Sequence, residues 1–217
     1  TAYVVGLAGS EDAQQALDWA LGVAEQGDSV VAVHSWEIPV VTGYESVAAI
    51  DTRAIEESAT DFLTEVMRER GEGRIEGKLV SGHPGRALVE VAGELAAGGH
   101  DVVVVVGHAG STKVGLLLGS TASYVIHHAR SPVAVVRGEL RLPVRTVVVG
   151  VDEPHPDHPD EPSIHALRWA LRLPCATRVE VHHAAFVPGV AAGRIAQPSI
   201  ESAEEVDQID RQLDDAI

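Results

Sequence analysis

The sequence predicts an α/β protein, built as an open, doubly wound parallel sheet that is followed by a partial second copy of the same unit. Three observations lead to this prediction. Strand patterns alternate with amphipathic helix patterns through residues 1–138. The five consecutive valines Val102–Val106 are apolar on both faces, as the central strand of a parallel sheet is. Several landmarks of residues 1–36 then recur in the same order after residue 144.

Each element of the first unit has a local signal. Ser10 is suited to cap the first helix, which Gly27 can end. Pro84 is suited to open a later helix, because its missing N–H is not needed in the first turn. The turn-rich residues 71–77 separate a helix from the following strand. The expected strands are residues 3–7, 30–36, 78–81, 102–106 and 132–137, and the expected helices are residues 11–27, 51–70, 85–97 and 120–129.

This arrangement predicts where a ligand binds. In an open α/β sheet the binding crevice lies beyond the carboxyl ends of the strands, at the point where the strand order reverses. The loops that follow Leu7, His34 and Val106 are therefore expected to face one crevice together.

A glycine-rich loop follows the valine strand and leads into the next helix. Gly107 and Gly110 begin the loop, and Gly119, Ser120 and Thr121 end it. Glycine lets backbone N–H groups approach an anion, and a helix N-terminus adds unpaired N–H groups and the positive end of a dipole. These parts predict a phosphate site. A plain strand-to-helix connection is the alternative, because short glycine loops are common.

The second copy is indicated by three landmarks. The strand that contains Gly6 recurs around Gly150, ALDWAL recurs as ALRWAL, and Val33-His34 recurs as Val181-His182. This copy, residues 144–217, lacks the later strands and a glycine loop, so it must pack on the first copy, pair with another chain or continue beyond residue 217. Its expected strands are residues 144–151 and 178–185, and its expected helices are residues 163–173 and 199–216.

Composition narrows the function classes. The net charge is −16, from 32 acidic and 16 basic residues, which argues against a nucleic-acid binder or a protein of anionic membrane surfaces. No apolar run reaches about 18 residues, so no membrane span is expected. Cys175 is the only cysteine, which favours a reducing compartment. The chain starts at Thr1 without a methionine, which indicates a processed or trimmed start.

These residues resemble the universal stress protein family. That family opens with a strand ending in VGVDGS, and this chain has VGLAGS at Gly6–Ser10 and VGVDEP at Gly150–Pro154. The family's second strand often ends in Val-His, as here. Its nucleotide-binding branch carries G-x2-G-x9-G-[ST] after a valine-rich strand, and this chain has Gly107-x2-Gly110-x8-Gly119-Ser120, with GLLLGS included.

The resemblance implies a Rossmann-like fold of the adenine nucleotide alpha hydrolase type. It also implies a cytoplasmic stress-response regulator that binds ATP, with Mg²⁺ as an accompanying ion, forms homodimers and catalyses little or nothing beyond slow, incidental hydrolysis. Neither nucleic acid nor a membrane is an expected partner. The nucleotide-binding positions that it implies are Leu7, Ala8, Ser35, Val106, Gly107, Gly110, Gly119, Ser120 and Thr121.

Two departures from the family pattern keep other functions open. Ala8 stands where the family has aspartate, and the glycine loop is one residue shorter. Losing one charged hydrogen bond costs roughly 1.5–3 kcal/mol of affinity. The first alternative is therefore a dimeric scaffold that has lost nucleotide binding. An adenylating enzyme of a related fold is a second, although no SGGxDS loop is present.

One segment of the second copy contains potential metal ligands. His155, Asp157, His158 and Asp160 are potential ligands of a divalent ion. The prolines between them keep the segment extended, and a solvated loop is the favoured interpretation. No metal is expected.

Overall fold

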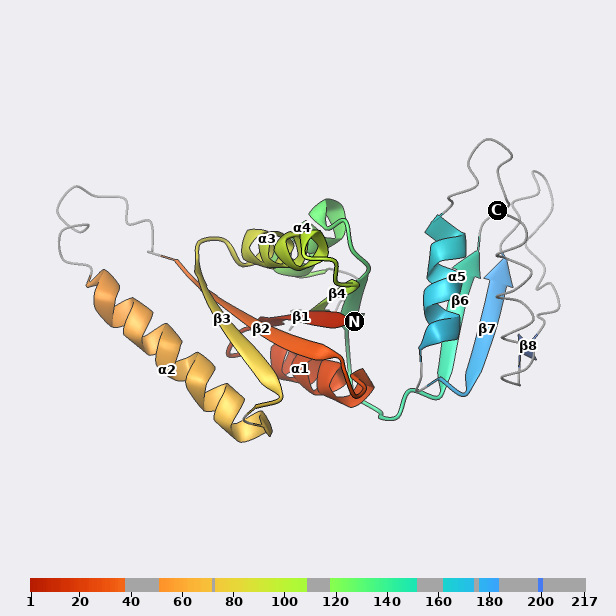
Figure 1. Ribbon diagram of the computed structural model, residues 1–217, viewed down its shortest axis with the longest axis horizontal. Helices are drawn as coiled ribbons and strands as arrows, with labels where there is room; N and C mark the ends of the chain where they lie inside the picture. The colour runs from red at the N-terminus through yellow and green to blue at the C-terminus, as the bar shows by residue number, and fades with distance from the viewer. Residues whose placement is uncertain are drawn as a thin grey trace. The chain divides into compact units, whose positions relative to one another are not determined.

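The computed structural model describes residues 1–37, 51–71, 73–108, 118–151, 162–173, 176–183 and 199–200. The chain divides into two compact units, Thr1–Leu140 and Arg141–Ile217. Unit 1 contains a five-stranded sheet and unit 2 a three-stranded sheet (Figure 1). The division falls between the two predicted copies.

The sheet of unit 1 is wholly parallel and has the strand order β3-β2-β1-β4-β5. Its direction of growth reverses between β1 and β4, as in a doubly wound sheet. The strands are β1 (Ala2–Leu7), β2 (Ser29–Trp36), β3 (Ile75–Ser81), β4 (Val102–Gly107) and β5 (Val133–Val136). The α/β fold class is therefore confirmed.

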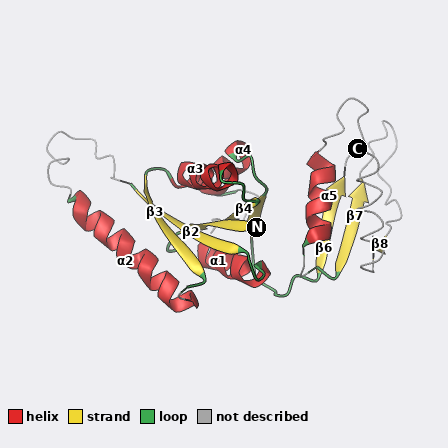
Figure 2. Ribbon diagram, in the orientation of Figure 1, coloured by secondary structure: helices red, strands yellow, loops and turns green. Residues whose placement is uncertain are grey.

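Four helices cover the two faces of this sheet (Figure 2). They are α1 (Glu11–Val23), α2 (Thr52–Gly71), α3 (Pro84–Ala97) and α4 (Ser120–His128). Helices α1 and α2 lie on one face and α3 and α4 on the other, because the crossovers run in opposite directions on the two sides of β1. None of the described helices is long and apolar enough to cross a bilayer.

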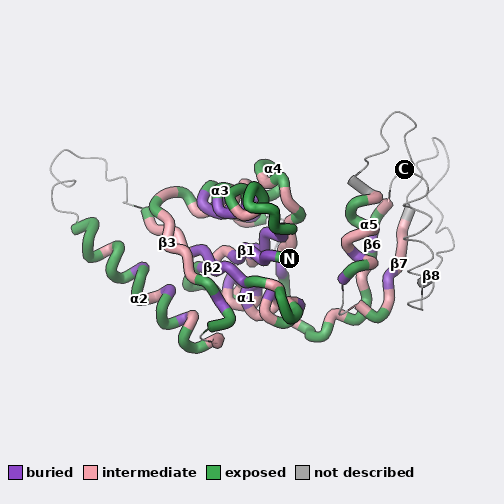
Figure 3. The backbone as a smooth tube through the Cα atoms, in the orientation of Figure 1, coloured by how far each residue is buried: buried purple, intermediate pink, exposed green. Residues whose placement is uncertain are grey.

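The core lies along β1 and β4. The valines of β4 are at most 6% exposed, and Val104 and Val105 are fully buried (Figure 3). Residues of both faces are buried because helices pack on each face. The valine run is therefore an inner strand of a parallel sheet, as the sequence predicts. β5 is an edge strand, as the proline before it suggests.

Helix and strand ends differ from the predictions at two places. The Ser10 side chain caps α1 as expected, accepting a hydrogen bond from the Ala13 N–H at 3.4 Å. The helix nevertheless ends at Val23, and Gly27, with a φ of 104°, serves the turn that follows. β3 begins at Ile75, inside the predicted break. Gly77 lies within the strand. A side chain does not fit there, because α2 packs so closely that a Cβ would lie 2.4 Å from the Met67 sulfur.

Unit 2 is built from a strand, a helix and a strand, followed by a short fourth element. These are β6 (Thr146–Val151), α5 (Pro162–Arg172), β7 (Arg178–His183) and β8 (Ser199–Ile200). β7 pairs parallel with β6 and antiparallel with β8. The helix predicted over residues 199–216 is wrong at its start, because residues 199–200 form a strand; residues 201–217 lie outside the described residues.

The register of unit 2 corrects the sequence alignment by one residue. Gly6 pairs with Val33 in unit 1, whereas Gly150 pairs with His182 rather than with Val181. Val181 instead packs, with Val179, in the apolar cluster under α5. β7 alternates polar and apolar residues, so only one register buries its valines.

Candidate functional site

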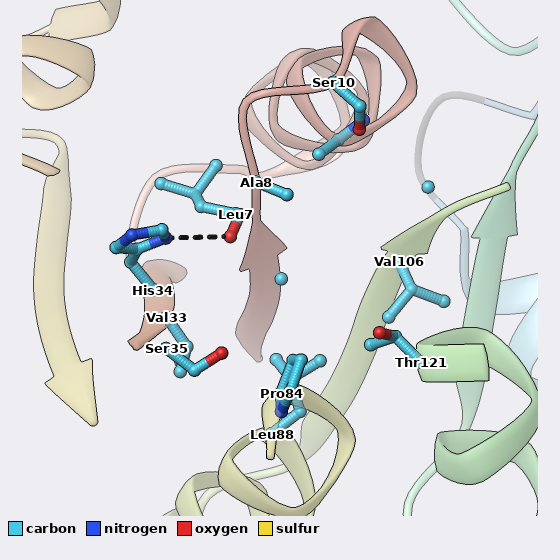
Figure 4. Close-up of a pocket in the computed structure, with 13 residues that line it drawn as sticks. Leu7, Ala8, Ser10, Val33, His34, Ser35, Pro84, Leu88, Val106 and Thr121 are labelled. Atoms are coloured by element: carbon cyan, nitrogen blue, oxygen red, sulfur yellow. Dashed lines mark hydrogen bonds between the residues drawn. The ribbon is translucent and has the colours of Figure 1, made fainter. Parts of the chain in front are cut away.

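A cavity of about 170 Å³ opens at the carboxyl ends of β1, β2 and β4 (Figure 4). It lies where the strand order reverses, which is the position that the fold predicts. Leu7 and Ala8 form one part of its wall and Ser35 of β2 another, while Val106 and Thr121 lie across from them. The carboxyl ends of β1, β2 and β4 thus meet in one place.

Most of the predicted site residues line this cavity. Six do so directly: Leu7, Ala8, Ser35, Val106, Gly107 and Thr121. Gly119 and Ser120 lie beside it, as the N-cap and first residue of α4. Gly110 and the loop segment 109–117 lie outside the described residues, as do His155, Asp157, His158 and Asp160.

Other lining residues were not predicted. Ser10 and Ala13 belong to the first turn of α1, and Pro84 and Leu88 belong to α3. Two of them could have been predicted to line the cavity. Ser10 and Pro84 mark helix starts, and the start of a helix that follows a parallel strand faces the crevice.

Three helix N-termini therefore converge on the cavity: those of α1, α3 and α4. Each adds the positive end of a dipole and N–H groups that lack a partner within the helix. At α4 the N-cap is Gly119, which has no side chain to accept a hydrogen bond from the first turn. The backbone N–H groups there remain available to an anion.

Gly107 is held against the start of α1. A Cβ at this position would lie 2.4 Å from the carbonyl carbon and oxygen of Asp12 and 2.8 Å from the Ala13 nitrogen. These are backbone atoms, which cannot swing aside as a side chain can. The glycine is thus required by helix-to-strand packing, whereas the sequence suggested only a phosphate as its reason.

His34 is the titratable side chain among the described lining residues. Its Nδ1–H donates to the Leu7 carbonyl oxygen at 3.1 Å (Figure 4). The ring also packs on Phe62 of α2, with the centroids 4.7 Å apart. Because Nδ1 carries the proton, the Nε2 atom of the neutral ring is a hydrogen-bond acceptor.

Ala8 is exposed and contributes a methyl group to the wall where a carboxylate was expected. The described residues also contain no group of three or more histidine, cysteine or acidic side chains placed to hold a metal ion. The wall is thus apolar and neutral at the strand ends and rich in N–H groups at the helix starts. Such a wall suits a ligand with a planar apolar part and an anionic part.

Comparison with known proteins identifies related chains. The model of the universal stress protein family matches residues 3–137. Universal stress protein Rv1996 of Mycobacterium tuberculosis is 28% identical over 173 residues, covering 69% of this chain and 53% of the relative. The chain therefore spans about half the length of the curated relatives that it matches.

A solved structure shows the same fold. Universal stress protein UspA from Lactobacillus plantarum is 20% identical, with a TM-score of 0.52, and the match covers 63% of this chain and 97% of that one. A universal stress protein solved in complex with cAMP is 27% identical, with a TM-score of 0.42 and coverage of 63% and 97%.

Proposed function

The chain belongs to the universal stress protein family, and on that premise we propose that unit 1 binds an adenine nucleotide in the cavity at the ends of β1, β2 and β4. The nucleotide that the family resemblance implies is ATP, with Mg²⁺ beside its phosphates. The convergence of three helix N-termini at this cavity is the observation that carries the proposal.

The two ends of the cavity suit the two ends of a nucleotide. The first turn of α4, with Ser120 and Thr121, offers N–H and hydroxyl donors to phosphate oxygens. The wall formed by Leu7 and Ser35 offers apolar surface and a hydroxyl to the nucleoside. Gly110 belongs to the same proposed phosphate loop by its motif position.

The role that we propose is regulation in the cytoplasm rather than catalysis. Hydrolysis would be accelerated by a side chain that positions or deprotonates the attacking water beside the reacting phosphate. His34, the titratable side chain among the described lining residues, lies across the cavity from Thr121 of α4 (Figure 4). Nucleotide binding would then change a conformation or an assembly.

The assembly that we propose is a homodimer through β5. This edge strand turns the carbonyl groups of Pro132 and Val136 toward β4, so the N–H groups of Val133 and Val135 face away from the sheet. Val135→Pro removes an outward N–H and no bond to β4. It is expected to convert a dimer to a monomer in light scattering, and a wild-type monomer would refute the proposal.

A dimeric scaffold that has lost nucleotide is the second candidate, and Ala8 is the observation that favours it. Mass spectrometry of nucleotides released from the denatured protein, followed by calorimetric titration of ATP with and without Mg²⁺, separates the two. Ala8→Asp restores the expected carboxylate and should tighten binding by about tenfold to hundredfold. Ala8→Asn, of the same size but uncharged, is the matched control.

Each result has a clear meaning. Micromolar binding that Thr121→Val weakens supports the nucleotide site. Binding by Ala8→Asp alone supports the scaffold for the natural chain. If neither protein binds up to millimolar ATP with Mg²⁺, the cavity is not a nucleotide site.

A further inference from the structure

A second hollow, of about 620 Å³, lies between the end of β2 and α2. Its volume is within the range of roughly 300–1,000 Å³ that small-molecule sites occupy. His34 lines both hollows, but strand alternation distinguishes them: Val33 and Ser35 line only the cavity, while Trp36 lines only this groove. We propose that this groove is a second small-molecule site, and that its ligand is a planar aromatic cation.

Aromatic rings form the walls of the groove. His34 and Trp36 come from the same face of β2, and Phe62 comes from α2. The ring of Phe62 lies 4.7 Å from that of His34, at an angle of 51°. Ile55 and Ala59 complete the apolar side. Ring faces of this kind bind flat apolar groups and attract a positive charge.

Two polar groups of the groove suit a cation. With Nδ1–H donated to Leu7, the Nε2 atom of the neutral His34 ring is an acceptor, and it faces away from Leu7 because the two ring nitrogens point in nearly opposite directions. Glu37 lies at the exposed rim, and it is the charged residue among the described lining. An ammonium or amidinium group on an aromatic ring matches the acceptor, the carboxylate and the ring faces.

The whole chain adds to the selectivity for cations. With a net charge of −16 it attracts cations and repels anions before they reach the groove. An anionic nucleotide and an aromatic cation need surroundings of opposite charge. The first suits the helix N-termini of the cavity and the second suits Glu37 and the rings.

The tryptophan side chains provide a built-in reporter. The chain has three tryptophans, and among them Trp36 lines the groove. Trp19 packs edge-on against Tyr3, with a centroid distance of 6.3 Å, and Trp169 belongs to α5 of unit 2. Their indole N–H signals in a ¹H–¹⁵N spectrum are assigned with single Trp→Phe variants of the full chain.

The experiment titrates that sample with benzylamine, benzyl alcohol and benzoate, without nucleotide. Benzylamine is expected to shift the Trp36 signal saturably, benzyl alcohol more weakly and benzoate not at all. Glu37→Gln should weaken benzylamine binding by about twofold to fivefold and leave benzyl alcohol unchanged. Because no nucleotide is added, the outcome is independent of the proposed nucleotide site.

A filled groove gives a second test. Ser58 lines the groove from an exposed position of α2, so Ser58→Phe fills it without disturbing the core and should abolish the shift. Thr60→Phe, at an exposed position of α2 that does not line the groove, should leave binding intact. The proposal is overturned if benzylamine gives no saturable Trp36 shift, if benzoate binds equally well, or if all three indoles move together.

Discussion

Replacing Gly107 by alanine tests the contact between the end of β4 and the start of α1. The added methyl group would lie 2.4 Å from two backbone atoms of Asp12, so either the strand end or the helix must shift. The φ of Gly107 is not in the left-handed region, so alanine meets no conformational penalty of its own. The cost is therefore one of overpacking.

The expected cost is about 2 kcal/mol, in the middle of the range of about 1–3 kcal/mol for overpacking. Unit 1 comprises Thr1–Leu140. At about 2.1 cal/mol/K per residue its unfolding entropy at the midpoint is about 0.3 kcal/mol/K. The melting temperature should therefore fall by about 7 °C.

Urea unfolding followed by fluorescence measures this cost, in a Trp169→Phe background so that the signal comes from unit 1. Gly9→Ala is the matched control, because a Cβ at Gly9 meets nothing within 4 Å. That control should be unchanged or more stable by up to about 1 kcal/mol. If Gly107→Ala and Gly9→Ala unfold at the same urea concentration with equal slopes, the close approach does not exist.

Three further outcomes are expected. Asp51 caps α2, accepting from the N–H groups of the second and third residues that follow it at 3.1 and 3.2 Å, so Asp51→Ala should cost about 1 kcal/mol in urea unfolding. Arg70 joins α2 to Asp18 of α1, and because both side chains are partly exposed, a double-mutant cycle should give a coupling of about 0.5–1 kcal/mol that salt reduces. The hydrogen bond from Arg68 lowers the pKa of the Glu65 carboxyl below its ordinary value. Its small stabilising contribution is therefore present above the ordinary pKa and is lost as the pH falls through the lowered one; a ¹³C titration should show the low midpoint, and Arg68→Ala should restore the ordinary value.

The unit 1 fold could be predicted because its signals are strong and mutually consistent. The valine run of β4 and the Ser10 cap are local features that tertiary packing reinforces. The predicted end of α1 at Gly27 was wrong because a glycine suits a turn as well as a helix end. The start of β3 was missed because Gly77 looks like a turn residue, and its packing against α2 cannot be read from neighbouring residues.

The candidate site was predictable where it depends on strand ends. Parallel strands bring their carboxyl ends to one edge, so the meeting of Leu7, Ser35 and Val106 followed from the strand order. The contributions of α3 and the Gly107–Asp12 contact depend on distances between distant segments. The register of β7 could not be predicted without knowing that α5 covers its valines.

The position of the cavity has a consequence for amide hydrogen exchange. Its walls begin at β1 and β4, the central strands, whose residues are the most deeply buried of unit 1. Amides of such strands exchange only when the whole unit unfolds. A ligand that binds only the native state lowers the population of the unfolded unit and so slows this exchange. A ligand at 100 times its dissociation constant should thus slow the slowest amides about 100-fold. Exchange at the buried amides of β1 and β4 would therefore report the affinity of the cavity for its ligand.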